Sequence, residues 1–480
     1  MMTRASLAAI ADAGLTPADI DGHISNKYVG HPSEEIAHAI GAATRRFTAV
    51  ADTAGGTATT GDALRLAQLA IEAGLARHVL VPYAIRSTKP GGVYGFHARE
   101  PQKAGLEMPA GFFGQPTYFA TMANRYAHEF GMSEAELASV SMTYRAWAAL
   151  TPSAQKRDPM DLDAYRQTPM ISTPLRVADC CLTTDGGGAY VVSAVEAARD
   201  LPHPVISVQG VGIGYNNYPH GVLFTQKPCT FDYPGWDSAA QAYAMAGVDP
   251  KDLDLAQVYD GFSISAIVQT EMLGLCDRGE GARFYAAGHA KPGGRMPVNT
   301  SGGHMSGGYV PGINLLIEAV RQLRGQEGDR QVPDARLCAG LTMGIPIYPV
   351  HLEDPLFQGY YDGLDAGELR ITADTETGEW VWYPPEVVPG KPDAVLEWRP
   401  VSPEGKAYSF TTVIRSLLPG DHKAEVPYTV ILFEPDDAPG VRIAGILVDD
   451  DGVDPACDMR LRFRPVEAGD HRIAGFAPVR

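Results

Sequence analysis

The sequence has no long hydrophobic run, and basic residues are fewer than acidic ones, with 39 Lys and Arg against 57 Asp and Glu. No stretch approaches the roughly 20 apolar residues that a membrane-spanning helix needs, and Asp12 interrupts the apolar run near the amino terminus, which indicates an amphipathic helix rather than a signal peptide. The net charge of −18 argues against nucleic acid or an anionic membrane as the main partner, because either would favour a clustered basic face. We therefore expect a cytoplasmic protein without a nucleic-acid or membrane partner.

Cysteine is also scarce, with six in 480 residues and no two of them at C-x-x-C spacing. Closely spaced cysteine pairs are typical of zinc sites, and dense cysteines are typical of secreted domains linked by disulfides. The pattern therefore predicts reduced thiols and no metal site. The cysteines are Cys180, Cys181, Cys229, Cys276, Cys338 and Cys457.

What the sequence does contain is an alternation of helical and strand-like segments over its first 350 residues. Residues 63–76, ALRLAQLAIEAGLA, are apolar at helical spacing, and residues 78–85, HVLVPYAI, form an apolar run typical of a buried strand. Repeated alternation of helix and buried strand predicts an α/β layered domain with a mainly parallel sheet. The remaining length leaves room for a further domain.

An internal repeat divides this α/β region. Residues 9–24 (AIADAGLTPADIDGHI) and 242–258 (AYAMAGVDPKDLDLAQV) share alanine, glycine, proline and acidic positions at one fixed offset. A second pair follows in the same order, because residues 52–74 and 299–325 each place a Gly-Gly loop before a long helix. The sequence therefore predicts a duplicated α/β fold over residues 1–350, with pseudo-repeats of about 1–200 and 201–350.

The amino-acid composition changes from about residue 351. Prolines and tryptophans become more frequent, and short β-rich runs such as YTVILFEP and MRLRFRPV are separated by Pro, Gly and Asp turns. Short strands at close spacing indicate a small barrel. We expect a linker at residues 351–395 and an all-β domain at residues 396–480.

The duplicated layout with paired glycine loops resembles the thiolase superfamily, specifically its sterol-carrier-protein-type branch of lipid-transfer proteins and aldolases. The resemblance covers most of residues 5–347 and implies a duplicated αβαβα layered fold. The family's usual first strand is missing, since this chain begins almost directly on the following helix. The matching stretches are GLTPADIDG, MSEAELASVSMTYRAWA, TPMISTPLRVADCCLTTDGGGAYVVSA, YDGFSISAIVQTEMLGLCDRGEGARF and VNTSGGHMSGGYVPGINLLIEAVRQLRG.

The carboxyl-terminal region resembles the zinc-ribbon/OB-fold proteins that partner these enzymes. The stretch from GELRITADTETGEWVWYPPE onward is similar to their ribbon and first barrel strand. Where that family has four cysteines, this chain has Asp374, Thr377, Val388 and Lys391, which cannot form a tetrahedral thiolate site. The resemblance therefore implies a metal-free remnant of the ribbon within residues 351–395 and an OB-fold-like barrel at 396–480.

A true thiolase carries a nucleophilic cysteine at the start of the helix that follows the first glycine loop, where the helix dipole lowers the pKa of the thiol. The corresponding stretch, DTAGGTATTGDAL, has Gly56 or Thr57 at that place and no cysteine. A threonine hydroxyl without a dedicated base is a poor substitute for a thiolate. We therefore expect no covalent thiolysis through this position.

The second loop, PVNTSGGHMSGGYVPG, has Gly308-Tyr309-Val310 where thiolases have Gly-His-Pro. A tyrosine here resembles the thiolase-like aldolases, which cleave a β-hydroxyacyl-CoA by a retro-aldol reaction. The resemblance implies that Tyr309 is an acid or base and that backbone N–H groups of the loop stabilise the enolate oxygen; the alternative for Tyr309 is packing against the next helix. The residues expected to bind substrate are Asn299, Ser301, Gly302, Gly303 and Gly308.

Four further residues are candidates for the catalytic site. His304 either polarises a carbonyl and tunes Tyr309 or is an ordinary hydrogen-bonding loop residue. In the stretch YDGF, Tyr259 is expected to donate to the developing oxyanion, whereas Asp260 either orients a group in the site or caps the following helix. Cys338 stands near the second cysteine of thiolases and is either an alternative nucleophile or acid/base group or part of the core.

The function that this pattern predicts is carbon–carbon lysis, in which a retro-aldolase cleaves a β-hydroxyacyl-CoA with a bulky, steroid-like or aromatic acyl group. A Claisen-type acyltransferase of the thiolase kind and a non-catalytic acyl-CoA or lipid-binding protein remain as alternatives. Coenzyme A enters only as part of the substrate, so we expect no separate cofactor. The resemblance also implies a homodimer and a complex with an enoyl-CoA hydratase.

Overall fold

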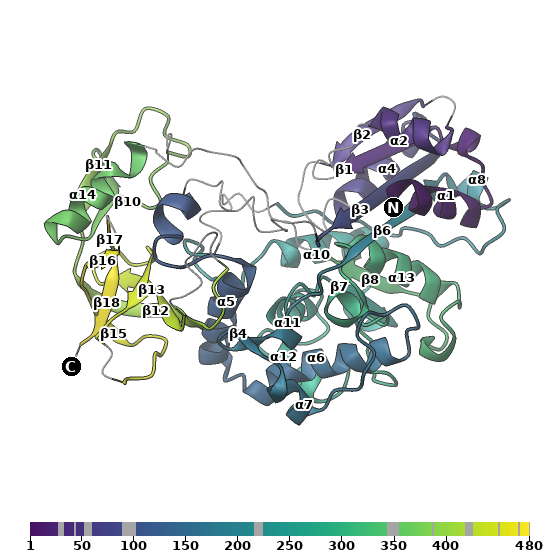
Figure 1. Ribbon diagram of the computed structural model, residues 1–480. Coiled ribbons are helices and arrows are strands. Elements are labelled where there is room, and N and C mark those ends of the chain that lie inside the picture. Colours follow the sequence, from purple (N-terminus) through teal and green to yellow (C-terminus); the bar gives the residue numbers. More distant parts are fainter. Residues whose placement is uncertain are drawn as a thin grey trace.

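The computed structural model describes residues 1–26, 33–42, 45–51, 60–88, 102–215, 224–342, 355–385, 388–417, 426–449, 452–468 and 471–479. An α/β part and an all-β carboxyl-terminal part lie side by side and meet near helix α5 (Gln115–Phe130) (Figure 1). Within the described ranges, no helix combines the length and the apolar character needed to cross a membrane.

A four-stranded sheet in the order β2-β1-β3-β6 forms the core of the amino-terminal half. β1 and β2 are parallel along their length, whereas β1 joins β3 only at Gly22↔Val79 and His23↔Leu80. β6 is antiparallel to β3. The strands are β1 (Gly22–Asn26), β2 (Phe47–Ala51), β3 (His78–Arg86) and β6 (Asp185–Ser193), and the helices of this half are α1 (Met2–Asp12), α2 (Ser33–Ile40), α4 (Gly61–Glu72) and α8 (Val195–Ala198).

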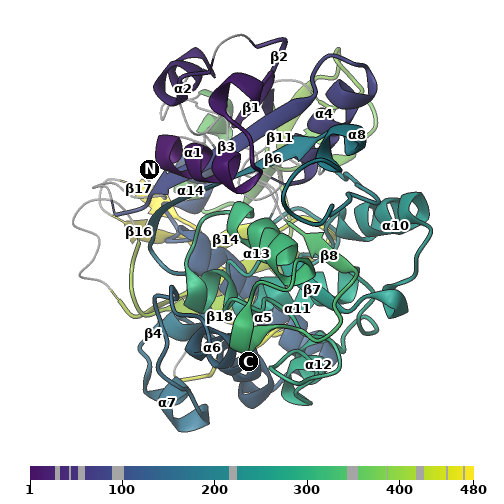
Figure 2. The same ribbon diagram turned by 90° about the vertical axis from the view of Figure 1, so that its right-hand side faces the viewer.

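Helix α1 shows how the sequence pattern fixes this layer. Its buried residues Met2, Ser6 and Ile10 recur every four positions and therefore share one face. That face packs against β3 and β6 (Figure 2). The predicted amphipathic helix at the amino terminus is thus present and covers the sheet.

The two segments of the sequence repeat form the same series of elements. α1 leads through the 3₁₀ turn Pro17–Asp19 into β1, and α10 (Gly235–Ala246) leads through the 3₁₀ turn Pro250–Asp252 into β7 (Leu255–Val258). In each turn the third-residue aspartate accepts from the backbone N–H just before the proline, at 2.8 and 2.9 Å. Proline at the first position and aspartate at the third therefore set the entry of both strands.

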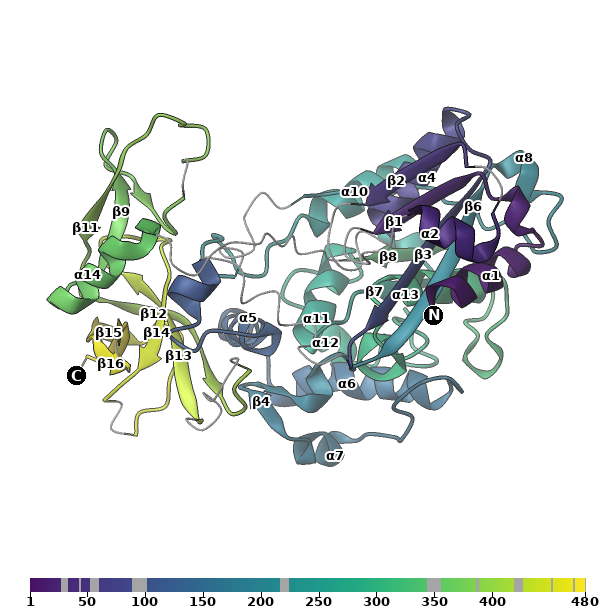
Figure 3. The ribbon, with the colours of Figure 1, turned by 45° about the horizontal axis from the view of Figure 1, so that its top comes forward.

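The carboxyl-terminal half of the α/β part is built around the parallel pair β7 and β8 (Cys338–Leu341). Val298 bridges to Ala256 on β7, so the glycine loop that follows Val298 begins beside this sheet. Helices surround the pair and fill the space toward the all-β part (Figure 3). They are α6 (Glu134–Ala149), α7 (Leu162–Gln167), α11 (Ser263–Met272), α12 (Gly281–Ala286) and α13 (Ile313–Leu323), together with α5 and α10.

The all-β part contains a closed ring of five strands in the order β12-β13-β14-β18-β15, in which β15 pairs again with β12. A three-stranded sheet, β10-β9-β11, stands beside it with helix α14 (Gln358–Ala366). The mixed α/β fold and the all-β carboxyl-terminal part agree with the fold class that the sequence predicts. The strands are β9 (Arg370–Asp374), β10 (Trp380–Val381), β11 (Leu396–Pro400), β12 (Glu404–Val413), β13 (Tyr428–Pro435), β14 (Ile443–Leu447), β15 (Arg460–Phe463), β16 (Val466–Ala468), β17 (His471–Ile473) and β18 (Gly475–Pro478).

Asp374 and Lys391, two of the four residues expected to stand in place of ribbon cysteines, take part in a backbone turn and an ion pair. Asp374 accepts from the backbone N–H groups of Glu376 and Thr377 at 2.8 and 3.1 Å, and Lys391 donates to Asp374 at 3.3 Å and to Glu379 at 2.8 Å. Among the described residues, no three His, Cys, Asp or Glu side chains are grouped so that they could hold a metal ion. A charged contact thus connects β9 with the segment near residue 391.

A strand contact and a hydrogen bond to a buried ion pair connect the two parts of the molecule. β12 continues the sheet into β4 (Met170–Ser172) and β5 (Leu175–Arg176) of the α/β part through the pair Val413↔Ser172. Lys103 and Glu107, both fully buried, pair at 2.9 Å, and Tyr383 of the all-β part donates to Glu107 at 3.0 Å. The ammonium of Lys103 also lies 3.9 Å from the centre of the Tyr118 ring. Charge, hydrogen bonding and a cation–π contact therefore all meet at this junction.

Removing one partner of this buried pair should be costly. The Lys103→Met variant leaves the Glu107 carboxylate without its counter-charge, and we expect it to lower the free energy of unfolding by about 3–5 kcal/mol at neutral pH. Burial raises the pKa of Glu107 above its ordinary value of 4.5, so the neutral acid is the form that folding favours. The deficit should therefore be largest above the raised pKa and shrink as the pH falls toward 4.5. Thermal unfolding of parent and variant across pH 4.5–8 measures this.

The exposed residue Lys251 provides the matched control. Its ammonium reaches Asp249 at 3.4 Å with both side chains largely in solvent, so Lys251→Met should change stability by less than about 1 kcal/mol at every pH. Equal effects of the two substitutions would contradict the interpretation of Lys103 as a buried counter-ion.

Candidate active site

Two tyrosine hydroxyls meet where the second repeat brings its strand and its glycine loop together. Tyr259 follows β7, Tyr309 ends the glycine loop, and their hydroxyl oxygens lie 2.7 Å apart. The backbone of Tyr259 is bonded to Leu341 of β8 at 3.0 Å, and the N–H of Tyr309 donates to the Thr184 hydroxyl at 2.8 Å. Two candidates that are 50 residues apart in sequence are therefore one hydrogen-bonded pair.

Burial raises the pKa of both tyrosines above the ordinary value of 10. The Cys181 thiol lies near enough to add to the shift on each ring, and for Tyr309 the neighbouring Tyr259 is the second largest cause. For Tyr259, the hydrogen bond from Tyr309 acts in the opposite direction. The two protons thus belong to the pair, and the pair needs a nearby positive charge to ionise at neutral pH.

Asp260 holds the glycine loop in place by hydrogen bonds to its backbone. Its carboxylate is fully buried and accepts the backbone N–H of His304 on both oxygens at 2.9 Å and that of Met305 at 3.1 Å. A Cβ on Gly303 would collide with this carboxylate, and Gly303 has a φ of +58°, so glycine is needed there. The structure thus places Asp260 on the loop and not at the cap of α11, which was the alternative at the sequence level.

His304 lies between Asp260 and the tyrosines. Its ring packs edge-to-face against Tyr259 and Tyr309, with centroids 5.0 and 5.2 Å apart. Its Nε2 lies 3.0 Å from Oδ1 of Asn314, and its Nδ1 lies 3.2 Å from Oδ1 of Asp260. His304 is fully buried, so these contacts, rather than solvent, define its environment.

The residues expected to bind substrate serve largely to hold the loop in shape. The Asn299 side chain accepts from Val258 N–H at 2.8 Å and donates to Val258 C=O at 2.9 Å. Gly302 donates its N–H to Asn299 at 2.8 Å, and Gly308 donates to Gly303 at 3.1 Å. The N–H groups of Gly302 and Gly308, on either side of the turn Gly303–Gly307 (η7), are thus bonded within the loop, and a role of these residues in substrate binding stays a prediction. The C=O of Ser301, just before this turn, lies close to Gly307.

Cys338 stands apart from the tyrosine pair. It begins β8 opposite Leu255, whereas Leu341, three residues later, bonds to Tyr259. Three residues of strand span about 10 Å, so the thiol and the pair lie toward opposite ends of the strand. Burial raises the pKa of the Cys338 thiol, which packs with Trp147 and other core residues. Gly56 and Thr57, the residues at the place of the thiolase nucleophile, lie outside the described residues.

Sequence reasoning missed three residues that hold the site. Gln269 clasps the backbone of Tyr259, accepting from its N–H at 3.2 Å and donating to its C=O at 2.6 Å. Thr184 receives the Tyr309 N–H, and Asn314 reaches His304. Gln269 and Asn314 are two of several polar residues in the helix stretches FSISAIVQTEML and INLLIEAV, so no local signal in the sequence singled them out.

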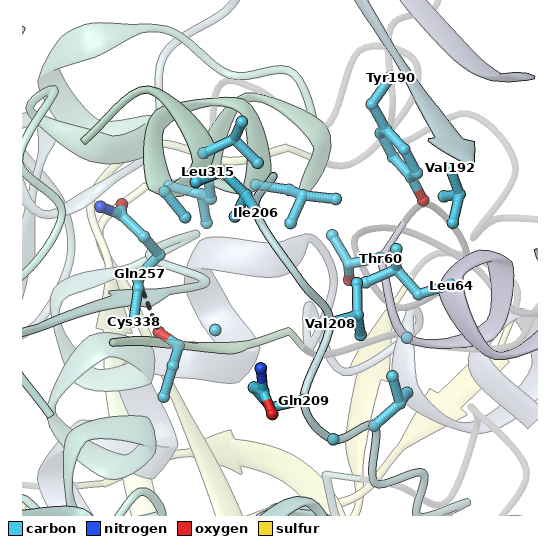
Figure 4. Close-up of a pocket in the computed structure, with 18 of the residues that line it drawn as sticks. Thr60, Leu64, Tyr190, Val192, Ile206, Val208, Gln209, Gln257, Leu315 and Cys338 are labelled. Carbon is cyan, nitrogen blue, oxygen red and sulfur yellow. Dashed lines mark hydrogen bonds between the residues drawn. The ribbon is translucent and has the colours of Figure 1, made fainter. Parts of the chain in front are cut away.

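A cavity of about 1800 Å³ lies beside the residues that hold the Tyr259 backbone, although neither Tyr259 nor Tyr309 lines it. Apolar side chains such as Leu64, Val208 and Leu315 form much of its wall, and Tyr190 and Gln257 also face it (Figure 4). Gln269 and Leu341, which hold the Tyr259 backbone, line the end of the cavity near the site. The cavity extends between α4, β6, α10 and α13, so it reaches both halves of the α/β part.

Comparison with known proteins agrees with this architecture. The family model "Thiolase C-terminal domain-like" matches residues 220–348. A steroid side-chain-cleaving aldolase of Thermomonospora curvata is 34% identical over 359 residues, covering 71% of this chain and 89% of the relative. A 17-hydroxy-3-oxo-4-pregnene-20-carboxyl-CoA lyase of Mycobacterium tuberculosis is 31% identical over 335 residues, covering 68% and 86%.

A solved structure gives the same indication. The structure titled "Ltp2-ChsH2(DUF35) aldolase" matches with a TM-score of 0.67 and 31% identity over 72% of this chain and 91% of that chain. Identity of this size over nearly the full length of the matched chains goes beyond a likeness of fold.

Proposed function

This chain belongs to the thiolase-superfamily aldolases, and on that premise we propose that it cleaves the Cα–Cβ bond of a β-hydroxyacyl-CoA whose acyl group is bulky and ring-containing. The observation that carries the proposal is the buried pair of hydroxyls on Tyr259 and Tyr309, 2.7 Å apart. Two relatives named for steroid substrates support the bulky acyl group.

The tyrosine pair supplies what a retro-aldol cleavage needs. One oxygen of the pair takes the proton of the substrate's β-hydroxyl, and the electron pair of the Cα–Cβ bond becomes the enolate of the thioester as the hydroxyl carbon becomes a carbonyl. The other hydroxyl donates to the enolate oxygen, which takes over the role first assigned to the loop glycines. Return of the proton to Cα gives a shorter acyl-CoA and a ketone or aldehyde.

His304 and Asp260 support the pair without a hydrogen bond to either hydroxyl. Asp260 holds the loop that carries His304 and Tyr309, and the His304 ring packs against both tyrosines. In this reaction the electron pair stays within the substrate and the proton moves between substrate and tyrosine. Coenzyme A, as part of the substrate, is therefore the only group besides the protein that the chemistry requires.

The quaternary and cellular setting is also part of the proposal. β2 is an edge strand of its sheet with Val50 57% exposed, which suits antiparallel pairing with a second copy in a homodimer. The five-stranded ring suits an OB-fold-like barrel, and the barrel resemblance supports a complex with an enoyl-CoA hydratase. We place the enzyme in the cytoplasm on the basis of its sequence.

The acyltransferase alternative requires a residue that can be acylated. Cys338 stands about one strand length from the tyrosine pair, with the pKa of its thiol raised by burial. Incubation with a radiolabelled acyl-CoA followed by peptide mass spectrometry tests the alternative directly. Stoichiometric acylation of Cys338 or Thr57 would favour acyl transfer over lysis.

The direct test is a panel of β-hydroxyacyl-CoAs that differ in the size of the acyl group. We expect release of acetyl-CoA or propionyl-CoA together with one equivalent of carbonyl product, fastest for ring-containing substrates. Mass spectrometry follows both products in the same reaction. Tight binding of the thioesters without release of either product would instead favour the non-catalytic binding protein.

A further inference from the structure

The side chain of Asn314 fixes where the hydrogens of His304 lie. Its Nδ2 donates to the carbonyl of Gly308 at 3.0 Å, so its Oδ1 faces the ring and can only accept. The His304 Nε2, 3.0 Å from that oxygen, must therefore carry a hydrogen. This assignment follows from the donor and acceptor chemistry of the amide alone.

The other edge of the ring then faces a carboxylate. His304 Nδ1 and Asp260 Oδ1 are 3.2 Å apart in a fully buried site, although the two are out of line for a good hydrogen bond. A neutral ring with its hydrogen on Nε2 would point a lone pair at Oδ1, and two acceptors at this distance repel. A second hydrogen on Nδ1 turns the repulsion into an ion pair.

That second hydrogen belongs on the ring rather than on Asp260. The carboxylate already accepts three contacts from the N–H groups of His304 and Met305, and such donors favour the ionised acid. A carboxyl group that was itself protonated would lose part of those interactions. The arrangement is thus satisfied by an imidazolium with Asp260 on one side and Asn314 on the other.

The charge state of this pair matters to the tyrosines beside it. With a neutral His304, Asp260 would leave a net negative charge under the site, and Asp260 is one of the groups that raise the pKa of Tyr259. With the imidazolium, the pair is electrically neutral and its positive end lies against both tyrosine rings. Ionisation of the tyrosine pair then no longer has to occur beside an uncompensated carboxylate.

We propose that Asn314 is a positioning residue that holds His304 in the doubly protonated form, and that this neutral Asp260–His304 pair is what lets the Tyr259–Tyr309 pair act as the base. The kinetic part rests on the proposed function, because it concerns the base of that reaction. The protonation of His304 is independent of turnover.

The neighbouring tyrosines and cysteine add no further negative charge beside the Asp260–His304 pair at pH 7. Burial raises the pKa of Tyr144 on α6 and of Tyr285 on α12, and raises that of Cys181 to about 12, so all three are neutral at pH 7. Tyr83 on β3, which has its pKa raised to about 12, is neutral as well. Arg145 on α6 donates to Ser306 at 3.4 Å and adds a second positive charge near the loop.

The spectroscopic arm of the test reads the histidine directly. Protein labelled with ¹⁵N-histidine is compared with His304→Gln to assign the ring, and the two-bond ¹H–¹⁵N spectrum at pH 7 shows whether each ring nitrogen carries hydrogen. We expect both nitrogens of His304 to carry hydrogen in the parent and only one in Asn314→Leu. A bare Nδ1 in the parent would overturn the inference whether or not the protein is a lyase.

The kinetic arm uses three variants and a pH profile. Asn314→Leu removes the acceptor, and we expect kcat/KM at pH 7 to fall about tenfold or more, with the rising limb of the pH profile moved to higher pH by about one unit. Asn314→Asp keeps an acceptor oxygen, so both ring nitrogens of His304 should still carry hydrogen in the spectrum, but its added negative charge should also move the limb to higher pH. Gln326→Leu, an amide lost from an exposed turn, should match the parent throughout.

The two arms separate the possible failures. A uniform loss of activity at every pH in Asn314→Leu, with the His304 spectrum unchanged, would mean that Asn314 only packs, and would refute the proposal. Absence of lyase activity in the parent would refute the proposed function but leave the spectroscopic result to decide the protonation of His304. A bare ring nitrogen on His304 in Asn314→Asp, as in Asn314→Leu, would also count against the role of the acceptor oxygen.

Discussion

The Tyr309→Phe variant is expected to lower kcat by about 10²–10⁴-fold, the range that a positioned proton donor or acceptor contributes. KM should change by no more than a few-fold, because the ring and its packing against His304 remain. The reason is that Tyr309 and Tyr259 share one hydrogen bond of 2.7 Å at the end of β7, so neither hydroxyl can act in the same way once the other is gone. Steady-state kinetics with the best substrate of the panel measures the effect.

The hydrogen bond between the two tyrosines also predicts how the effects of single and double substitutions on kcat combine. If the two hydroxyls act as one unit, Tyr259→Phe and the double variant should each lose about as much as Tyr309→Phe, rather than the product of two losses. Multiplicative losses would mean that the two tyrosines contribute separately.

The protein contains a second pair of tyrosines that serves as the control. The hydroxyls of Tyr144 and Tyr285 are likewise 2.7 Å apart and buried, with their rings edge-to-face, but they lie between α6 and α12. We expect Tyr285→Phe to lower stability by about 1 kcal/mol and to leave kcat within a factor of three. A Tyr309→Phe variant that behaved like Tyr285→Phe would favour a binding protein over an enzyme.

The sequence was enough to predict the elements that bring Tyr259 and Tyr309 together. Both stand at the end of a strand or loop in the second repeat, and the repeat itself is visible as a fixed offset between residues 9–24 and 242–258. Local signals of this kind, a proline turn or a glycine loop before a helix, depend on neighbours in the chain. They were therefore readable without a structure.

The sequence did not predict which hydrogen-bond donor in the site meets which acceptor. The sequence does not show that the N–H of Gly302 donates to Asn299 and that of Gly308 to Gly303. Asn314 and Gln269 reach the site from two different helices, and a single sequence does not say which polar residue on a helix meets which loop. Contacts between elements far apart in sequence are set by packing, which local patterns do not encode.

The contacts between the all-β part and the α/β part could likewise not be predicted from the sequence. The strand-rich texture after residue 351 predicts the barrel, but nothing in it predicts that Arg442 enters the α/β part. Arg442 is almost fully buried, and its guanidinium donates to the carbonyls of Thr225 and Pro228 at 2.9 and 3.0 Å and also to that of Lys227. Its guanidinium carbon lies 3.6 Å from the centre of the Tyr408 ring on β12.

The Arg442→Met variant is therefore expected to loosen the barrel from the α/β part. Three backbone carbonyls would lose their donor, and each unsatisfied buried group costs about 1–3 kcal/mol, so we expect a loss of about 3 kcal/mol or more in the free energy of unfolding. Phe224, next to Thr225, packs on Phe119, and Phe119 stacks on Phe262, three residues after Tyr259. We therefore expect kcat/KM to fall as well, and protease cleavage within residues 224–230 to become faster.

Arg460→Met is the matched control for this prediction, because it makes the same change on the outer face of the barrel. Arg460 pairs with Asp436 at 2.6 Å, but both side chains are about half exposed, and a solvent-screened pair contributes only about 0–1 kcal/mol. Thermal unfolding, limited proteolysis and kinetics on the two variants together separate docking from surface charge. If Arg442→Met lost stability but kept both its cleavage rate at residues 224–230 and its kcat/KM, the buried guanidinium would stabilise the barrel alone, and the contacts from Arg442 through Phe224 to the tyrosine pair would play no part in catalysis.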